Sequence, residues 1–186
     1  NLKILNKNSS VEFDGMWSSS LTDSATKGKP DNSSLDFSAR VSSLNDMMDV
    51  TTKPLVFDAD NGGQLEHLPF LIRSLERSGV SAIIMEDKIG LKKNSLFKNQ
   101  SDTQQDKPQT FAKKIKKICS ARRSNDFLVI ARIESFIVGK GLKDALYRAE
   151  IYSKAGADAI LIHSKEKTPA EIFSFAKAFK KSKYYI

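Results

Sequence analysis

Short apolar runs alternate along the chain with longer segments in which apolar residues recur at helical spacing. The short runs predict strands, because each is bounded by polar residues or glycine, and the longer segments predict amphipathic helices. The expected strands are Phe13–Trp17, Pro54–Asp58, Ala82–Glu86, Phe127–Arg132 and Ala159–His163, with a further strand beginning at Tyr184. The expected helices are Asp36–Asp49, Glu66–Ser78, Gln109–Arg122, Leu142–Lys154 and Pro169–Lys180.

This alternation of strands and helices predicts an α/β fold with a parallel sheet and helical crossovers. The strand segments are continuously apolar, so we expect both faces of the sheet to be covered. Two polar segments, Ser19–Ser34 and Lys88–Gln109, interrupt the pattern and are expected to be loops. Each follows the carboxyl end of a strand, which is the catalytic face of a β/α barrel, so both loops are candidates for a functional role.

The composition changes this picture little. A chain of 186 residues with 40% hydrophobic and 28% charged residues is typical of one soluble domain. The net charge of +8 is compatible with a nucleic-acid partner, but we interpret it as a basic surface, because the lysines concentrate on amphipathic segments and no nucleic-acid-binding motif is present. No apolar run reaches the length of a membrane span, and Cys119 is the single cysteine. We therefore expect a cytoplasmic protein with neither a membrane nor a nucleic-acid partner.

The expected strands end in residue types that active sites use. The residues at or just after the five ends are Trp17-Ser18-Ser19, Asp58-Ala59-Asp60, Glu86-Asp87, Arg132-Ile133-Glu134 and His163-Ser164. Because parallel strands end at one edge of a sheet, these side chains are expected to surround one mouth.

The chemistry of this set favours a small, anionic substrate that chelates a metal. Asp58, Asp60 and Glu86 supply the hard oxygen ligands that suit Mg²⁺, which keeps several waters and takes only one or two carboxylates. Arg132 offers a planar fork for a phosphate or carboxylate, and His163 offers a proton or a hydrogen bond. Ser19 and the backbone N–H groups after it can bind an oxyanion.

Each of these features also has a purely structural interpretation. Asp58-Ala59-Asp60 followed by Asn-Gly-Gly is compatible with a simple turn. Glu86-Asp87 is compatible with a cap on the following segment. Arg132 is compatible with a simple ion pair to Glu134 or Asp58. A lone histidine such as His163 is more often a structural residue. The coincidence of all five at equivalent strand ends favours an active site.

At this level of detail the chain resembles the phosphoenolpyruvate mutases of the isocitrate lyase/phosphoenolpyruvate mutase superfamily. The motifs that carry the resemblance are "WSSSLT", "FDADNGG", "IIMEDKIGLKKNS", "VIARIESFIVGKG" and "AGADAILIHSKEK". The resemblance implies a TIM-type (β/α)8 barrel, of which residues 1–186 would hold about strands 2–7 as one partial domain. It further implies that residues 88–108 form an active-site lid.

The resemblance also implies roles for individual residues. The residues similar to the family's substrate-binding wall and anion cradle are Trp17, Ser19, Ser20 and Leu21. Asp58 resembles the direct Mg²⁺ ligand, and Asp60 and Glu86 resemble residues that hold the metal through water. The residues similar to the family's catalytic set are Asp31, Lys92, Asn94, Arg132 and His163.

The implied activity is a Mg²⁺-dependent intramolecular phosphoryl transfer between phosphoenolpyruvate and 3-phosphonopyruvate, in a homodimer or homotetramer. The lid discriminates among relatives: the lyases of the superfamily carry a "KCGH"-type motif where this chain reads "KKNS". The alternative of a phosphonopyruvate hydrolase is disfavoured by Asn94, which the hydrolase characteristically lacks. Another alternative is a truncated, inactive barrel that serves as a scaffold. Asn61 stands where the family usually has threonine.

Overall fold

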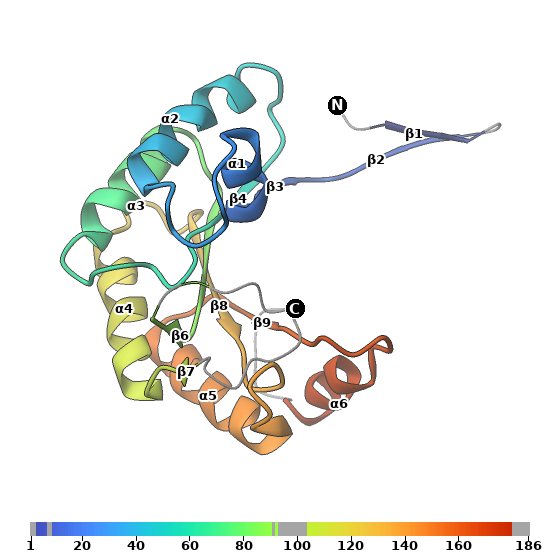
Figure 1. Ribbon diagram of the computed structural model, residues 1–186, viewed down its shortest axis with the longest axis vertical. Helices are drawn as coiled ribbons and strands as arrows, with labels where there is room; N and C mark the ends of the chain where they lie inside the picture. Colours follow the sequence, from blue (N-terminus) through green and yellow to red (C-terminus); the bar gives the residue numbers. More distant parts are fainter. Residues whose placement is uncertain (1–2, 7–8, 91, 93–103, 180–186) are drawn as a thin grey trace.

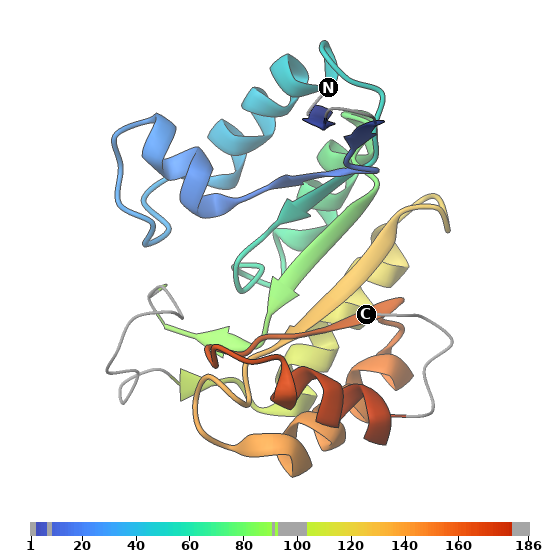
Figure 2. The ribbon, with the colours of Figure 1, turned by 90° about the vertical axis from the view of Figure 1, so that its right-hand side faces the viewer.

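The fold centres on one curved parallel sheet. The structure is a computed structural model that describes residues 3–6, 9–90, 92 and 104–179. The strands of the sheet, in their spatial order, are β3 (Met16–Ser18), β4 (Leu55–Asp58), β5 (Ala82–Glu86), β8 (Leu128–Ile133) and β9 (Ala159–Ile162). All neighbouring pairs are parallel, and spatial order follows chain order, as in a segment of a β/α barrel. Figure 2 shows these strands lying side by side.

The longer helices lie along the outer side of this curved sheet (Figure 1). They are α2 (Phe37–Met48), α3 (Leu68–Arg77), α4 (Pro108–Ala121), α5 (Gly141–Ala155) and α6 (Ala170–Ala178). The short helix α1 (Ser20–Thr26) directly follows β3 at the carboxyl-end edge of the sheet. Two small antiparallel hairpins complete the described elements: β1 (Lys3–Asn6) with β2 (Ser9–Glu12), and β6 (Lys88–Ile89) with β7 (Gln104–Gln105). The first hairpin extends away from the sheet, and the second joins the two ends of the segment expected to be a lid (Figure 1).

The hydrophobic core lies between the sheet and its outer helices. Strand residues such as Phe57, Val129 and Ile160 are fully or almost fully buried, and they pack with Ile115 of α4 and Tyr152 of α5 in one cluster. Burying this apolar surface is the main force that holds the helices against the sheet.

The sequence pattern predicted all five strands of the main sheet and the helices α2 to α6, with boundaries displaced by a few residues. Two expectations were wrong. The segment Ser19–Ser34 is not all loop, because it contains α1, whose buried residues are polar and so gave no apolar period. Within the described part of the chain, the inner face of the sheet is also covered only in part: Ile84 is buried there, but Val56, Ile130 and Leu161 are only half-buried. Closing that face requires more strands than the five described here.

The strand expected at Tyr184 lies outside the described residues. Within the described part of the chain, no helix is long and apolar enough to cross a membrane.

Candidate active site

The strand register brings the predicted site residues to one face of the sheet. Asp58 pairs with Ile84, and Glu86, two residues further along, pairs with Arg132. Arg132 in turn pairs with Leu161, two residues before His163. Because side chains alternate between the faces of a strand, this register places Asp58, Glu86, Arg132 and His163 on the same inner face, at the carboxyl ends of their strands. Trp17 pairs with Val56 and belongs to that face as well.

A tight turn after β4 holds the two aspartates together. The Asp60 backbone N–H donates to the Asp58 carboxylate at 3.0 Å, and Asp60 has a positive φ of 49°. Gly62 follows with a φ of 79°, and a Cβ at this position would lie 2.5 Å from the Met85 sulfur. Glycine suits this position because its φ is positive, and any larger residue would also force the Met85 side chain to move. The turn interpretation of these residues is therefore confirmed, and their role as metal ligands stays a prediction.

A lysine ammonium lies among the carboxylates on this side of the mouth. Lys92 Nζ lies 2.6 Å from Asp60 Oδ1 and 2.7 Å from Asp31 Oδ1, and it also contacts Ser20 Oγ. Ser20 Oγ donates to Asp58 at 3.3 Å, which links Asp58 to the same cluster. Burial alone would lower the pKa of the Lys92 ammonium, but the Asp60 and Asp31 carboxylates outweigh it and raise that pKa above its ordinary value.

The donor set of this cluster fits a hard divalent cation. Asp60 Oδ1 is buried and accepts no hydrogen bond of acceptable geometry from the described residues, although it forms the ion pair with the Lys92 ammonium. A cationic group thus already occupies the space between Asp31 and Asp60. Among the described residues, no group of three or more His, Cys, Asp or Glu side chains is arranged around a common point. Mg²⁺ does not need one, since water and substrate oxygens complete its octahedron.

Glu86 lies deeper in the mouth, beside two cations. Its side chain is 5% exposed; Oε2 lies 3.1 Å from Arg132 and Oε1 lies 3.5 Å from Lys88 Nζ. Burial raises the pKa of Glu86 to about 7, and the positive charges of Arg132 and Lys88 offset only part of that effect. A nearby divalent cation would favour the ionised form.

Glu134 joins the basic residues of the mouth. Its fully buried Oε1 accepts from Arg132 Nε at 2.5 Å and lies 2.8 Å from His163 Nδ1. The same His163 nitrogen lies 2.7 Å from an Arg132 N–H, so the tautomer decides whether it donates to Glu134 or accepts from Arg132. Burial would raise the pKa of Glu134, but the His163 hydrogen bond and the Arg132 charge lower it to about 2. Glu134 is therefore ionised and orients both residues.

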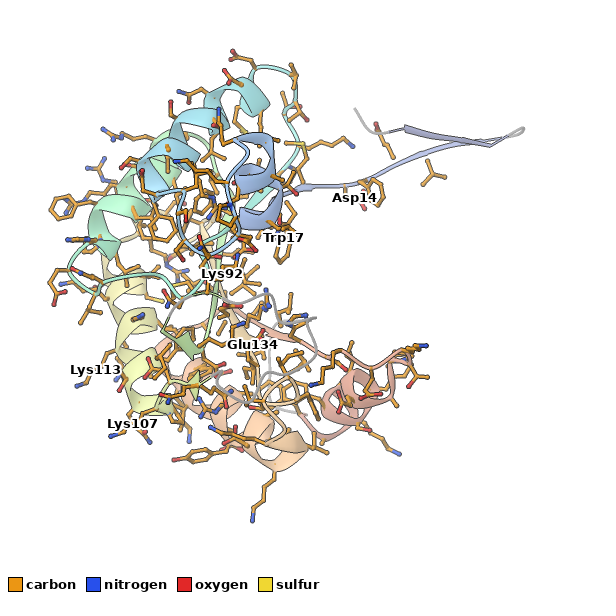
Figure 3. All side chains as sticks on the ribbon, in the orientation of Figure 1. Asp14, Trp17, Lys92, Lys107, Lys113 and Glu134 are labelled. Atoms are coloured by element: carbon orange, nitrogen blue, oxygen red, sulfur yellow. The ribbon has the colours of Figure 1, made fainter. Side chains whose placement is uncertain are left out.

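The aspartate cluster around Lys92 and the group around Arg132 form two sides of the mouth, and their charges interact. The negative charge of Asp58 raises the pKa of both Glu86 and Arg132, which places all three within interaction range. Lys92 and Glu134, which represent the two sides, lie with Trp17 on the inner side of the curved fold (Figure 3). The mouth therefore has an acidic side suited to a cation and a basic side suited to an anionic group.

The structure shows less about the remaining predicted residues. Trp17 and Leu21 are about half exposed, at 46% and 50%. Ser19 is the N-cap residue of α1, which begins at Ser20. Asn94 lies outside the described residues, as does most of the segment expected to be the lid.

Sequence reasoning gave no site role to three buried charged residues, Glu134, Lys88 and Arg40. The signal for Glu134 is its spacing of two from Arg132, which places both on one face of the strand. The signal for Arg40 is its position four residues before the buried Leu44 on α2, where the core-facing side of the helix carries a charge. The arginine–glutamate pair considered as a structural alternative does form, inside the mouth.

Comparisons with known proteins identify the family of this chain. The family profile described as phosphoenolpyruvate phosphomutase matches residues 3–184. The chain is 41% identical over 170 residues to the phosphoenolpyruvate phosphomutase of Tetrahymena pyriformis, covering 90% of this chain and 56% of that protein. It is 38% identical over 170 residues to the phosphonopyruvate hydrolase of a Variovorax species, covering 90% of this chain and 58% of that protein.

Solved structures give the same result. The crystal structure of phosphoenolpyruvate phosphomutase from Streptomyces platensis matches with a TM-score of 0.85 at 36% identity, covering 90% of this chain and 58% of that one. Phosphonopyruvate hydrolase in complex with oxalate and Mg²⁺ matches with a TM-score of 0.80 at 35% identity, covering 91% of this chain and 58% of that one. The chain thus spans a little over half the length of these relatives, and the prediction of a partial TIM-type barrel is confirmed. It belongs to the phosphoenolpyruvate phosphomutase family, within the phosphoenolpyruvate mutase/isocitrate lyase superfamily.

Proposed function

We propose that the protein interconverts phosphoenolpyruvate and 3-phosphonopyruvate by an intramolecular phosphoryl transfer. The observation that carries this proposal is the two-sided mouth: Asp58 and Asp60 with Lys92 on one side, Arg132 and His163 on the other. Phosphoryl transfer has a loose transition state that needs positioning and charge stabilisation more than covalent chemistry. A site with an acidic and a basic side separates those two tasks.

In this proposal the pyruvate part of the substrate lies on the acidic side. When bound there, Mg²⁺ would hold the substrate oxygens and offset their negative charge. Asp58 would be its direct ligand, and Asp60 and Glu86 would hold it through water. The Lys92 ammonium, which now lies between Asp31 and Asp60, would be free to contact the anionic substrate.

The phosphoryl group lies on the basic side. Arg132 presents N–H donors to its oxygens, and His163 supplies a further hydrogen bond or a positive charge. Glu134 keeps both residues in place through its 2.5 Å and 2.8 Å contacts. The P–O bond to the enol oxygen breaks and a P–C bond forms at C3, so no water enters the balance.

Substrate walls and a cover complete the proposed site. Trp17 and Leu21 expose apolar surface beside Ser19 and Ser20 at the rim, as a wall and anion cradle require. We further propose that residues 88–108 form the lid that excludes water, with the β6–β7 pairing as its base. Asp31 and Asn94 would act together with this lid. Assembly into a homodimer or homotetramer is part of the proposal and is measurable by light scattering.

The second candidate is phosphonopyruvate hydrolysis. It is supported by an identity to the hydrolase of 38%, close to the 41% to the mutase. The lid asparagine, Asn94, favours the mutase, because the hydrolase characteristically lacks it. A catalytically inactive scaffold is the third candidate, and the retained charged residues of the mouth argue against it.

Phosphorus NMR separates the three candidates. Protein supplied with Mg²⁺ and phosphonopyruvate should convert the phosphonate resonance to that of phosphoenolpyruvate. Inorganic phosphate and pyruvate as sole products would support the hydrolase instead, and an unchanged spectrum would support the scaffold. Asp58→Ala should lower Mg²⁺-dependent turnover by about a thousandfold, because metal stabilisation of the transition state is worth several kcal/mol. Undiminished turnover would remove Asp58 from the metal site.

A further inference from the structure

A buried arginine on an outer helix, Arg40, reaches the ends of β3 and β4 from the side opposite the mouth. Arg40 belongs to α2, on the outer layer, and is 2% exposed. Its guanidinium lies 4.3 Å above the centre of the Phe57 ring, whose side chain points to the covered face of β4. An arginine buried this deeply is rare unless it is paired and hydrogen-bonded, so its partners indicate its role.

One group of contacts is with the turn that carries the two aspartates. Arg40 NH1 donates to the Asp58 backbone oxygen at 2.5 Å. The same nitrogen lies 4.0 Å from Asp60 Oδ2, the carboxylate oxygen that does not face Lys92. Arg40 therefore holds the backbone of one aspartate and faces the side chain of the other.

The other group of contacts is with the end of β3 and the start of α1. Arg40 Nε donates to Asp23 Oδ2 at 2.8 Å, and NH2 donates to the Ser18 backbone oxygen at 3.3 Å. Ser18 Oγ donates to the same Asp23 oxygen at 3.0 Å, which closes a small buried network. Ser18 directly precedes Ser19 and Ser20, so this network also sets the position of the rim on the acidic side.

We infer that Arg40 is a positioning residue that fixes Asp58 and Asp60 in the geometry that binds the divalent cation. This inference deepens the proposed function and rests on its assignment of a metal to these two aspartates. A planar guanidinium reaches three acceptors on two strands and one helix at once. A lysine ammonium keeps the charge but loses the fixed fork, so the role depends on arginine rather than on positive charge.

Two other roles make different predictions. If Arg40 only balanced the acidic charge, Arg40→Lys would leave cation affinity unchanged. If Arg40 only supported the fold, cation affinity would follow thermal stability. Positioning of the ligands predicts weaker cation binding in a protein that is still folded, by about tenfold, as is typical when outer partners of metal ligands are removed.

The test measures binding of Mn²⁺ alone by electron paramagnetic resonance, with Mg²⁺ competition, and thermal unfolding by circular dichroism. The variants are Arg40→Lys and, as a matched control, Arg122→Lys. Arg122 also bridges a carboxylate, Asp158 at 2.5 Å, and a backbone oxygen, that of Phe127 at 3.0 Å, but it does so at the amino-terminal edge of the sheet. We expect Arg40→Lys to weaken Mn²⁺ binding about tenfold and Arg122→Lys to leave it unchanged.

A double variant, Asp23→Leu/Arg40→Met, guards against simple unfolding. Replacing a buried ion pair by apolar residues often restores stability. Positioning predicts that Mn²⁺ binding stays weak when stability returns. Recovery of wild-type affinity in this variant, an unchanged affinity in Arg40→Lys, or absence of Mn²⁺ binding by the wild-type protein would each overturn the inference. None of these outcomes depends on which phosphorus product forms, so failure of the proposed reaction is detected separately.

Discussion

Two neighbouring carboxylates at the end of β5, Glu86 and Asp87, lie in two different regions of the molecule. Both side chains are almost fully buried, and burial raises the pKa of both. Glu86 belongs to the inner face and lies beside Lys88 and Arg132 at the mouth. Asp87, one position further along, points to the opposite face and meets the outer helix α5.

The Asp87 region is a closed network of hydrogen bonds. Its carboxylate accepts from Tyr152 at 2.7 Å, from Arg148 at 3.1 Å and from the Glu134 backbone N–H at 3.0 Å. Gln105 of β7 donates to both of its oxygens. These partners join β5, β7, β8 and α5, so Asp87 ties several elements together and is committed to the fold.

The Glu86 region differs in what its charges face. The cations beside Glu86, Lys88 and Arg132, lie in the mouth. They do not fully offset the effect of burial, so the pKa of the Glu86 carboxyl is raised to about 7. A buried charge with a full set of hydrogen bonds stabilises structure, whereas one left titratable at an open mouth is available for chemistry. Burial and charge alone do not distinguish the two regions; the partners do.

Removing Asp87 should have the largest effect on stability. We expect Asp87→Ala to lower the free energy of unfolding by about 3–5 kcal/mol, because Tyr152 loses its buried acceptor and Arg148 keeps Asp144 but loses its other carboxylate partner. Chemical denaturation followed by circular dichroism measures this loss. Asp87→Asn, which keeps part of the hydrogen bonding, should lose less. A loss below about 1 kcal/mol for Asp87→Ala would show that this hydrogen-bond network contributes little to the stability of the fold.

Glu86 should make the stability of the protein depend on pH. Its folded pKa of about 7 lies above the ordinary 4.5, so the metal-free folded protein retains a proton that the unfolded chain releases. Stability should therefore fall as the pH rises from 4.5 to 7, by up to about 3 kcal/mol, and Glu86→Gln should remove this dependence. Urea unfolding at a series of pH values, without metal, measures it. Equal pH profiles for wild type and variant would contradict the assigned titration, and added Mg²⁺ should narrow the difference.

The smallest effect concerns the helix that carries Arg40. Asp36 is the N-cap of α2 and accepts from the Ala39 backbone N–H at 3.0 Å, a hydrogen bond that lowers the pKa of Asp36. We expect Asp36→Ala to cost about 1 kcal/mol, as is typical for loss of a cap. Asp46→Ala, at an exposed position within the same helix, is the control and should change stability by less than about 0.5 kcal/mol. Equal effects of the two substitutions would show that the cap contributes nothing specific.

The local pattern predicted much of this molecule because its signals are short-range. Apolar runs located β4, β5, β8 and β9, and helical periodicity located α3 and α4. The spacing of two between Arg132 and Glu134 is itself a short-range signal that both side chains share a face. The helix α1 escaped prediction because its buried residues are polar and their partners, such as Arg40, lie far along the chain.

The residue types at the strand ends follow from the sequence. Parallel strands of known direction must present those residues at one edge. Three features followed only from the folded structure. They are the different partners of Glu86 and Asp87, the position of Lys92 between aspartates, and the hydrogen bond from Arg40 to the Asp58 backbone. Each depends on contacts between residues distant in the chain, and the sequence pattern carries no information on which buried charges meet.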